Sequence, residues 1–247
     1  MNAQISAELL KVRTTRALYV VMVVVVAFAA LIPSLACTDP VKYGVAPLTP
    51  ASLADLMRAP AQVTGGAALL LGILASAGEY NHRSILTTRL VLPNPLRLLT
   101  AKVLAMAAVG AALGTTAETV AAGVGAIGLA ANGVELEPLA HGIPGITASV
   151  ILLVTGYAVL GTAIGTLLRN PTAAVGATLL WVFAIENALP VVTGNPRLSD
   201  WMPGNAAHQV LAPDTSNPTP AAATAILLAI TAMLIALAAT ADTRRDP

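Results

Sequence analysis

The chain carries very little charge for its length. Of its 247 residues, 10% are Asp, Glu, Lys or Arg and 56% are apolar. A soluble domain carries roughly 25% charged residues, so this chain cannot bury its apolar surface inside one globule. The net charge of +1 also lacks the basic excess that binds nucleic-acid phosphates. We therefore expect an all-α integral membrane protein with no nucleic-acid partner.

Several kinds of functional site are also missing. The single cysteine, Cys37, excludes an intrachain disulfide framework and a metal site built from cysteines. The histidines His82, His141 and His208 fall in separate predicted loops, so we expect no shared metal site. Nothing matches the nucleotide-binding pattern G-x-x-x-x-G-K-[ST], and neither G-x-S-x-G nor H-E-x-x-H occurs. We expect no catalytic residues and no cofactor in this chain, so any ATP must be hydrolysed by another protein.

Long apolar runs are what the sequence has instead. Crossing a bilayer takes about 20 apolar residues in a helix, and six runs fit within one membrane domain, residues 1–247. The predicted spans are 17–36, 59–78, 103–132, 143–168, 171–192 and 220–241.

The connections between the spans have their own signals. Asn170 and Pro171 predict the start of the fifth span, as a helix cap and a first helical residue. Residues 37–58 are predicted to form an external loop, because prolines, glycines and charges interrupt them. Residues 193–219 are predicted to form a second external loop that contains short helices.

Residues 1–16 predict an amphipathic helix in the membrane interface, an elbow before the first span. Its apolar and charged residues are expected on opposite faces, Ile5, Leu9, Leu10 and Val12 against Glu8, Lys11 and Arg13. A second interpretation is a cleaved signal peptide or lipoprotein site, suggested by the basic start and Ser34-Leu35-Ala36-Cys37. The apolar run is longer than a signal core needs, so we favour a retained span. Pro33, late in that span, predicts either a kink or its end.

Basic residues fall unequally on the two sides of the membrane. With six spans, ten Lys or Arg residues lie on the side that carries both termini, and Lys42, Arg58 and Arg197 lie on the other. Basic residues are enriched on the cytoplasmic side. We therefore predict a multi-pass protein of the cell membrane with both termini, and the polar segment 79–100, in the cytoplasm.

Segment 79–100 is the most specific pattern in the chain. It follows the second span with GEYNHRSILTT, residues 78–88, and continues to Pro93, Arg97 and Ala101-Lys102. Together with the elbow, the six spans and the helical loop before the last span, it resembles the membrane subunit of ABC-2 type ABC transporters, the type V exporters. Arg83 stands where that family usually has glycine, and Ser84 where it has threonine.

The resemblance implies an export permease that pairs with a second permease copy or a paralogue. It also implies two partner ATP-binding subunits, which would hold ATP and magnesium. Segment 79–100 would be the coupling helix that docks on them, through Glu79, Tyr80, Asn81, His82, Arg83, Ser84, Thr87 and Thr88. The alternative is an ordinary solvated loop beside the lipid headgroups. Few aromatic residues in the spans suggest a weakly polar or amphipathic cargo, such as a drug, lipid or peptide.

Two acidic residues fall inside predicted spans, where a charge costs roughly 2.5 to 3.5 kcal/mol. Glu186 precedes Asn187 and Pro190, and Pro190 cannot donate to the carbonyl of Glu186, which predicts a bend. Glu186 then either lines the transport path or a helix contact, or is solvated near the headgroups. Glu118 pairs with a nearby threonine hydroxyl or is protonated, and we favour a packing role. The alternative function is a stand-alone ion-coupled carrier or channel that uses both acids.

Two glycine pairs predict close helix contacts. Gly110 and Gly114, and Gly161 and Gly165, follow the G-x-x-x-G spacing that lets helices approach in membranes. We expect them to pack helices of one chain rather than to form a seam between two.

Overall fold

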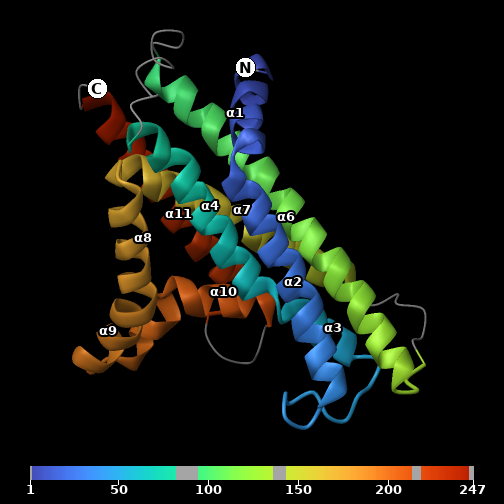
Figure 1. Cartoon of the computed structure of the whole chain (residues 1–247). Helices are drawn as coiled ribbons and strands as arrows, with labels where there is room; N and C mark the ends of the chain where they lie inside the picture. Colours follow the sequence, from blue (N-terminus) through green and yellow to red (C-terminus); the bar gives the residue numbers. More distant parts are fainter. Residues whose placement is uncertain (1, 82–93, 136–142, 213–217, 245–247) are drawn as a thin grey trace.

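The structure, a computed structural model, describes residues 2–81, 94–135, 143–212 and 218–244. Within these ranges the regular elements are all helical, and six helical segments are long and apolar enough to cross a membrane (Figure 1). The predicted all-α membrane fold is confirmed at this level. A helix suits the bilayer because it satisfies every backbone hydrogen bond internally, where no water is available.

The helices follow the predicted spans closely. The N-terminal helix is α1 (Asn2–Thr14), and the first span is α2 (Arg16–Thr38), which continues past Pro33. The remaining helices of the bundle are α3 (Ser52–Arg58), α4 (Ala61–Asn81), α6 (Pro95–Ala131) and α7 (Ile143–Leu168). The fifth span consists of α8 (Pro171–Leu180), a π-helical stretch (Trp181–Ile185) and α9 (Glu186–Val192). A 3-10 helix (Pro196–Trp201) and α10 (Pro203–Leu211) precede the last span, α11 (Pro220–Arg244).

Asparagine followed by proline starts two of the long helices. The side chain of Asn170 accepts a hydrogen bond from the amide of Ala173 at 3.1 Å, and Pro171 is the first helical residue, as predicted. Asn94 accepts from the amides of Leu96 and Arg97 in the same way, ahead of Pro95. In both cases the side chain satisfies amides that have no partner within the helix, and proline has no amide to satisfy.

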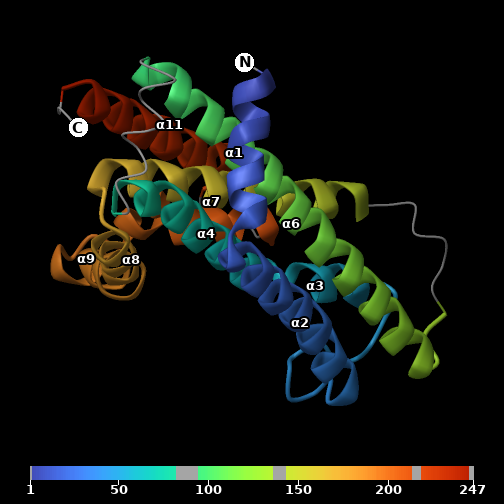
Figure 2. The same cartoon turned by 45° about the horizontal axis from the view of Figure 1, so that its top comes forward.

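Both termini of the described chain lie at one end of the bundle. Figures 1 and 2 show the start of α1 and the end of α11 there, together with the end of α4 and the start of α6. The helices α3 and α9 lie at the opposite end in Figure 1. This arrangement agrees with an even number of crossings.

Glycines bring α4, α6 and α7 into close contact. A Cβ atom on Gly161 of α7 would meet the carbonyl oxygen of Leu69, and one on Gly165 would lie 2.8 Å from the carbonyl oxygen of Ile73, both on α4. On α6, a Cβ on Gly110 would lie 2.9 Å from the Cβ of Ala158, and Gly114 faces Ile151. The two predicted glycine pairs therefore pack helices of one chain, as expected.

Two predicted segments differ from the structure. Residues 37–58 are not wholly an external loop, because α3 lies among them and buries Leu53, Leu56 and Met57 in the main hydrophobic core. Segment 79–100 is not a separate element in its described part, because 79–81 are the last turn of α4 and 95–100 are the first turns of α6. Both predictions treated a polar or charged stretch as the end of a helix. Such stretches also occur within helices, as in α3 and in the parts of α4 and α6 that extend beyond their apolar runs.

The N-terminal helix is present, but its predicted division into two faces is not supported. Glu8 is buried, whereas Leu10 is 61% exposed. Glu8 is buried because it contacts Lys102 of α6 as well as Lys11 of its own helix, and the sequence of α1 by itself does not show the contact with α6.

Candidate functional site

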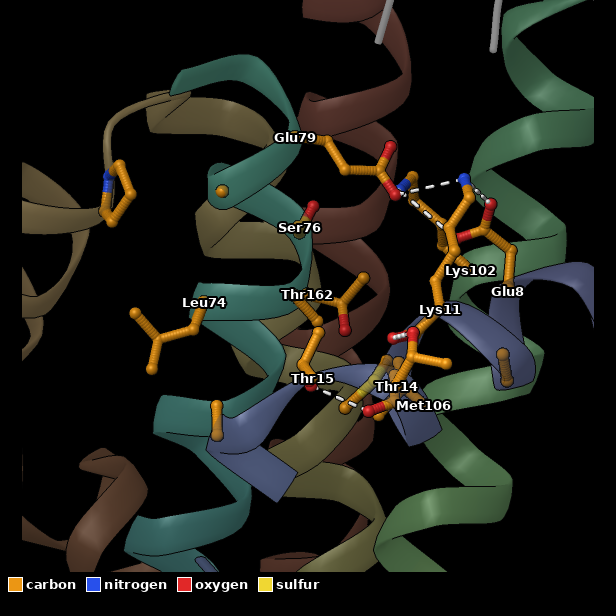
Figure 3. A pocket seen from close by; sticks show the side chains of 16 residues that line it. Glu8, Lys11, Thr14, Thr15, Leu74, Ser76, Glu79, Lys102, Met106 and Thr162 are labelled. Carbon is orange, nitrogen blue, oxygen red and sulfur yellow. Dashed lines mark hydrogen bonds and ion pairs between the residues drawn. The ribbon is translucent and has the colours of Figure 1, made fainter. Parts of the chain in front are cut away.

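Four charged side chains meet where the chain leaves α4 and returns in α6. Glu8 and Lys11 come from α1, Glu79 from the last turn of α4, and Lys102 from α6 (Figure 3). We call this set the ion quartet. It links three helices at the end of the bundle that carries both termini.

Each lysine of the ion quartet bridges the same two carboxylates. The Nζ atom of Lys11 lies 2.6 Å from Glu8 Oε1 and 3.2 Å from Glu79 Oε1. The Nζ atom of Lys102 lies 3.3 Å from Glu8 Oε2 and 2.7 Å from Glu79 Oε1. A buried charge is costly without a partner, so this alternation of signs is what permits Glu8, Glu79 and Lys102 to lie together at low exposure.

The two lysines differ in their surroundings. The side chain of Lys102 is 6% exposed and that of Lys11 is 41% exposed. Burial lowers the pKa of Lys11, but the hydrogen bond to Glu8 and the negative charges of Glu79 and Glu8 outweigh it, so the pKa lies above its usual 10.5. Lys11 is therefore a protonated cation at the solvent-accessible edge of the ion quartet.

A hollow of about 640 Å³ opens beside the ion quartet. Figure 3 shows Glu8, Lys11 and Lys102 on the right, with Glu79 reaching toward them from above and Thr14 and Thr15 below. Leu74, which also lines the hollow, lies on the left and points away from these charges. Ser76 and Thr162 also line it. The hollow thus has a charged wall, an apolar wall and several residues with hydroxyl groups.

A second polar contact lies at the same end of the bundle and uses Tyr80. The hydroxyl of Tyr80 donates to Asp242 of α11 at 2.8 Å, and Arg169 Nη2 lies 2.9 Å from the same carboxylate oxygen. The Arg169 guanidinium also stacks over the Tyr80 ring, 5.0 Å from its centroid. Arg169 has a positive φ of 55°, which turns the chain sharply between α7 and α8. Tyr80 therefore joins α4 to the turn and to α11.

The predicted coupling residues fall into two groups. Glu79 and Tyr80 are in the contacts just described, and Asn81 is exposed at the end of α4. The remaining five lie outside the described residues: His82, Arg83, Ser84, Thr87 and Thr88.

A search against models of protein families and a search of curated proteins both find no match to this chain. The likeness to ABC-2 exporters therefore depends on the residue pattern described above.

Glu118 is buried within α6, apart from the ion quartet. It is 3% exposed, and neither of its oxygens has a hydrogen-bond partner among the described residues. Each of the neighbouring hydroxyls, on Thr115, Thr116 and Thr119, donates to a carbonyl of its own helix. A protonated carboxyl fits this setting better than a carboxylate, since an ionised group without a partner is far more costly in an apolar environment.

Glu186 lies at the start of α9 and contacts α10. Its Oε1 atom accepts a hydrogen bond from the amide of Gly204 at 2.5 Å, in the first turn of α10. Asn187 donates to the carbonyls of Val182 and Phe183 in the π-helical stretch, and Pro190 lies inside α9. Glu186 thus acts as a cap for a neighbouring helix, where the favourable helix dipole stabilises a carboxylate.

The sequence pattern missed the partners of Glu79. Glu8 and Lys11 were predicted only as part of the charged face of the N-terminal helix, and Lys102 only as the end of the pattern that resembles ABC-2 exporters. Arg169 and Asp242 stood out only as charges next to apolar runs. Their common signal is a position next to a span on the side that carries both termini.

Within the described ranges, no group of three or more His, Cys, Asp and Glu side chains is placed to hold a metal ion.

Proposed function

We propose that this chain is the membrane-spanning permease subunit of an ATP-driven ABC exporter. The observation that supports it best is the ion quartet, which joins α1, α4 and α6 on both sides of segment 82–93. In this proposal segment 82–93 is the centre of the coupling segment and docks on a partner ATPase. Movement of the docked segment then shifts α4 and α6 together at this end, because Glu79 and Lys102 form an ion pair between them, with Oε1 and Nζ 2.7 Å apart.

The transport cycle requires partners that this chain does not contain. Two ATP-binding subunits would bind ATP and magnesium, and their closure on nucleotide would tilt the membrane helices between inward- and outward-open arrangements. The cargo would be a drug, lipid, peptide or other amphipathic molecule. No residue assigned here is catalytic.

The fifth span supports a second permease copy or a paralogue. Within the chain, none of the apolar window in Pro171–Val192 is buried, and Phe183 is 75% exposed. This apolar surface fits contact with a second permease as well as with lipid. In the proposed orientation, both termini and the ion quartet face the cytoplasm of a cell-membrane protein, since most basic residues lie on that side.

Purification of the full chain from its native membrane tests this proposal. We expect an ATP-binding subunit in stoichiometric amount, whose ATP turnover changes when the permease is removed. The proposal is wrong if the chain neither associates with such a subunit nor alters its turnover.

Charge exchange within the ion quartet tests the coupling role. Glu79→Lys and Lys102→Glu each place like charges together and should reduce permease-dependent ATP turnover. Because Glu79 also contacts Lys11 and Lys102 also contacts Glu8, only an exchange of all four signs restores every contact. The fourfold variant Glu8→Lys, Lys11→Glu, Glu79→Lys and Lys102→Glu should therefore recover part of the turnover. Equal loss in all three variants, with normal insertion and assembly, would argue against coupling through this contact.

Glu118 supports a second candidate, an ion-coupled carrier or channel. A buried carboxyl without a described partner in a membrane helix is a suitable proton site. Glu186 would be the second proton site. If this function is right, transport persists without ATP, collapses with the proton gradient, and is lost in Glu118→Gln. If transport instead requires ATP and survives in Glu118→Gln, the carrier is excluded.

A further inference from the structure

The hollow beside the ion quartet lies at the depth of the lipid headgroups. Thr14 and Thr15 at the end of α1 line it, as does Ala17 at the start of the apolar span α2. The transition from polar to apolar helix marks the membrane interface on this side. The hollow has a volume of about 640 Å³, within the range of roughly 300 to 1,000 Å³ that is typical of small-molecule sites.

The walls of the hollow suit an amphipathic ligand. The ion quartet forms one wall, while Leu74, Ala105 and Met106 supply apolar surface. A molecule that fills it would place a polar group against the charges and hydrocarbon against the apolar side chains. Membrane lipid of the adjacent leaflet has this character and is present at high concentration at this depth.

The charges of the hollow favour a ligand without net charge. The ion quartet contains two lysines and two glutamates, so their formal charges cancel. Pockets that select anionic lipids have an excess of basic residues. The described residues that line this hollow have no such excess. A zwitterionic headgroup brings one charge of each sign and leaves the balance unchanged.

The two charged ends of a zwitterionic headgroup would contact different residues of the hollow. Lys11 is the more exposed cation and is positioned to bind a phosphate. The hydroxyls of Thr14 and Thr15 donate to the carbonyls of Lys11 and Val12, so their oxygens remain as acceptors toward the hollow. A primary ammonium offers N–H donors to these oxygens, whereas a quaternary ammonium has none.

From these features we propose that the hollow binds the headgroup of phosphatidylethanolamine from the leaflet on this side of the membrane. The site is distinct from the proposed transport function and does not depend on it, because it requires only the ion quartet, the hydroxyls and the apolar wall. A bound lipid would hold α1 against α4 and α6 at the membrane surface.

Native mass spectrometry of the purified full chain, with its partners if any remain bound, tests this site. The probe is an equimolar mixture of phosphatidylethanolamine, phosphatidylcholine and phosphatidylglycerol with identical acyl chains. We expect phosphatidylethanolamine to bind in excess over both others. No excess over phosphatidylcholine would overturn the proposal, and a preference for phosphatidylglycerol would reduce the site to a simple cationic surface.

Two variants locate the binding. Lys11→Gln removes the charge-assisted hydrogen bond to the phosphate and should lower the binding of phosphatidylethanolamine about tenfold. Gly78→Leu should abolish it by filling the hollow, because Gly78 lines the space and a Cβ there meets nothing within 4 Å. Arg97→Gln is the matched control, since Arg97 is an exposed cation of α6 outside the hollow and its loss should change nothing.

Binding of phosphatidylethanolamine that is undiminished in both Lys11→Gln and Gly78→Leu would also overturn the proposal, because the lipid would then bind elsewhere. Gly78→Leu keeps all four charges, so it remains informative if Lys11→Gln proves unstable. Loss of lipid preference with normal ATPase association would separate this site from the proposed function.

Discussion

Lys11 and Lys102 bind the same two carboxylates, but they differ in burial and therefore in how much their ion pairs stabilise the fold. Lys102 is almost fully enclosed, so removing its charge would leave Glu8 and Glu79 short of a buried partner. Breaking a buried ion pair from one side typically costs about 3 to 5 kcal/mol. Lys11 remains partly in water, so its interactions are screened more strongly.

The raised pKa of Lys11 makes stability depend on pH in a defined direction. A lysine whose folded pKa exceeds its unfolded value of 10.5 stabilises the fold fully below pH 10.5, and this contribution is lost as the pH rises through the raised value. We therefore expect the melting temperature of the purified protein to fall on the alkaline side of 10.5.

Lys11→Arg is the control for this pH dependence, because guanidinium stays protonated where other lysines and tyrosines titrate. Wild type should lose more stability than Lys11→Arg over the same alkaline range. Identical alkaline curves for the two proteins would show that Lys11 contributes no measurable part.

At the scale of helices, small side chains decide which helices approach and which stand apart. The close contact of α4 with α7 uses glycines on both, Gly72 and Gly161, since a Cβ on either would collide with the partner backbone. In contrast, α8 and α9 bury very little apolar surface against the rest of the chain. A hydrogen bond from the amide of Gly204 to the carboxylate of Glu186 connects α9 to α10.

Gly161→Ala should destabilise the bundle. The new Cβ would meet the backbone of Leu69, and overpacking of this kind typically costs about 1 to 3 kcal/mol. Gly156→Ala in the same helix is the matched control, because a Cβ there meets nothing within 4 Å. Unfolding in detergent measures both, and equal stability of the two variants would contradict a tight contact between α4 and α7.

Glu186→Ala should loosen α10. Loss of a helix cap typically costs about 0.5 to 2 kcal/mol, and here the amide of Gly204 loses its acceptor. Amide hydrogen exchange in Pro203–Leu211 should become faster, whereas Glu186→Gln, which keeps an acceptor oxygen, should change less. Unchanged exchange in Glu186→Ala would mean that Glu186 has another role.

At the scale of the whole molecule, the six spans place both termini, the ion quartet and the contact between Tyr80 and Asp242 at one end. Any force applied at this end reaches α1, α4, α6 and α11 through side-chain contacts rather than through the backbone alone. The opposite end carries α3 and α9.

Accessibility of introduced cysteines tests this arrangement. In a Cys37→Ser background, Ser6→Cys and Arg97→Cys should both be protected from a membrane-impermeant maleimide in intact cells, and Asn195→Cys should be labelled. All three native residues are exposed, so protection would come from the membrane. The opposite pattern would reverse the orientation, and different labelling of Ser6→Cys and Arg97→Cys would disprove the six-span plan.

The sequence by itself determined the all-α class, the six helical segments that are long and apolar enough to cross a membrane, and the helix start at Asn170 and Pro171. Lipid imposes these locally, because each span must supply its own apolar length and its own backbone hydrogen bonds. It also predicted that both glycine pairs pack within one chain. It identified Glu79 as notable through a family resemblance, but not its ion-pair partners.

Only the tertiary structure decided which charges meet. Lys11 and Glu79 are 68 residues apart in the chain, and Lys102 and Glu8 are 94 apart. The burial of α3 and of Glu8 was decided in the same way. A charge next to a span carries no local signal of its partner, because that partner is set by which helices pack together, and helix packing depends on contacts summed over the whole bundle.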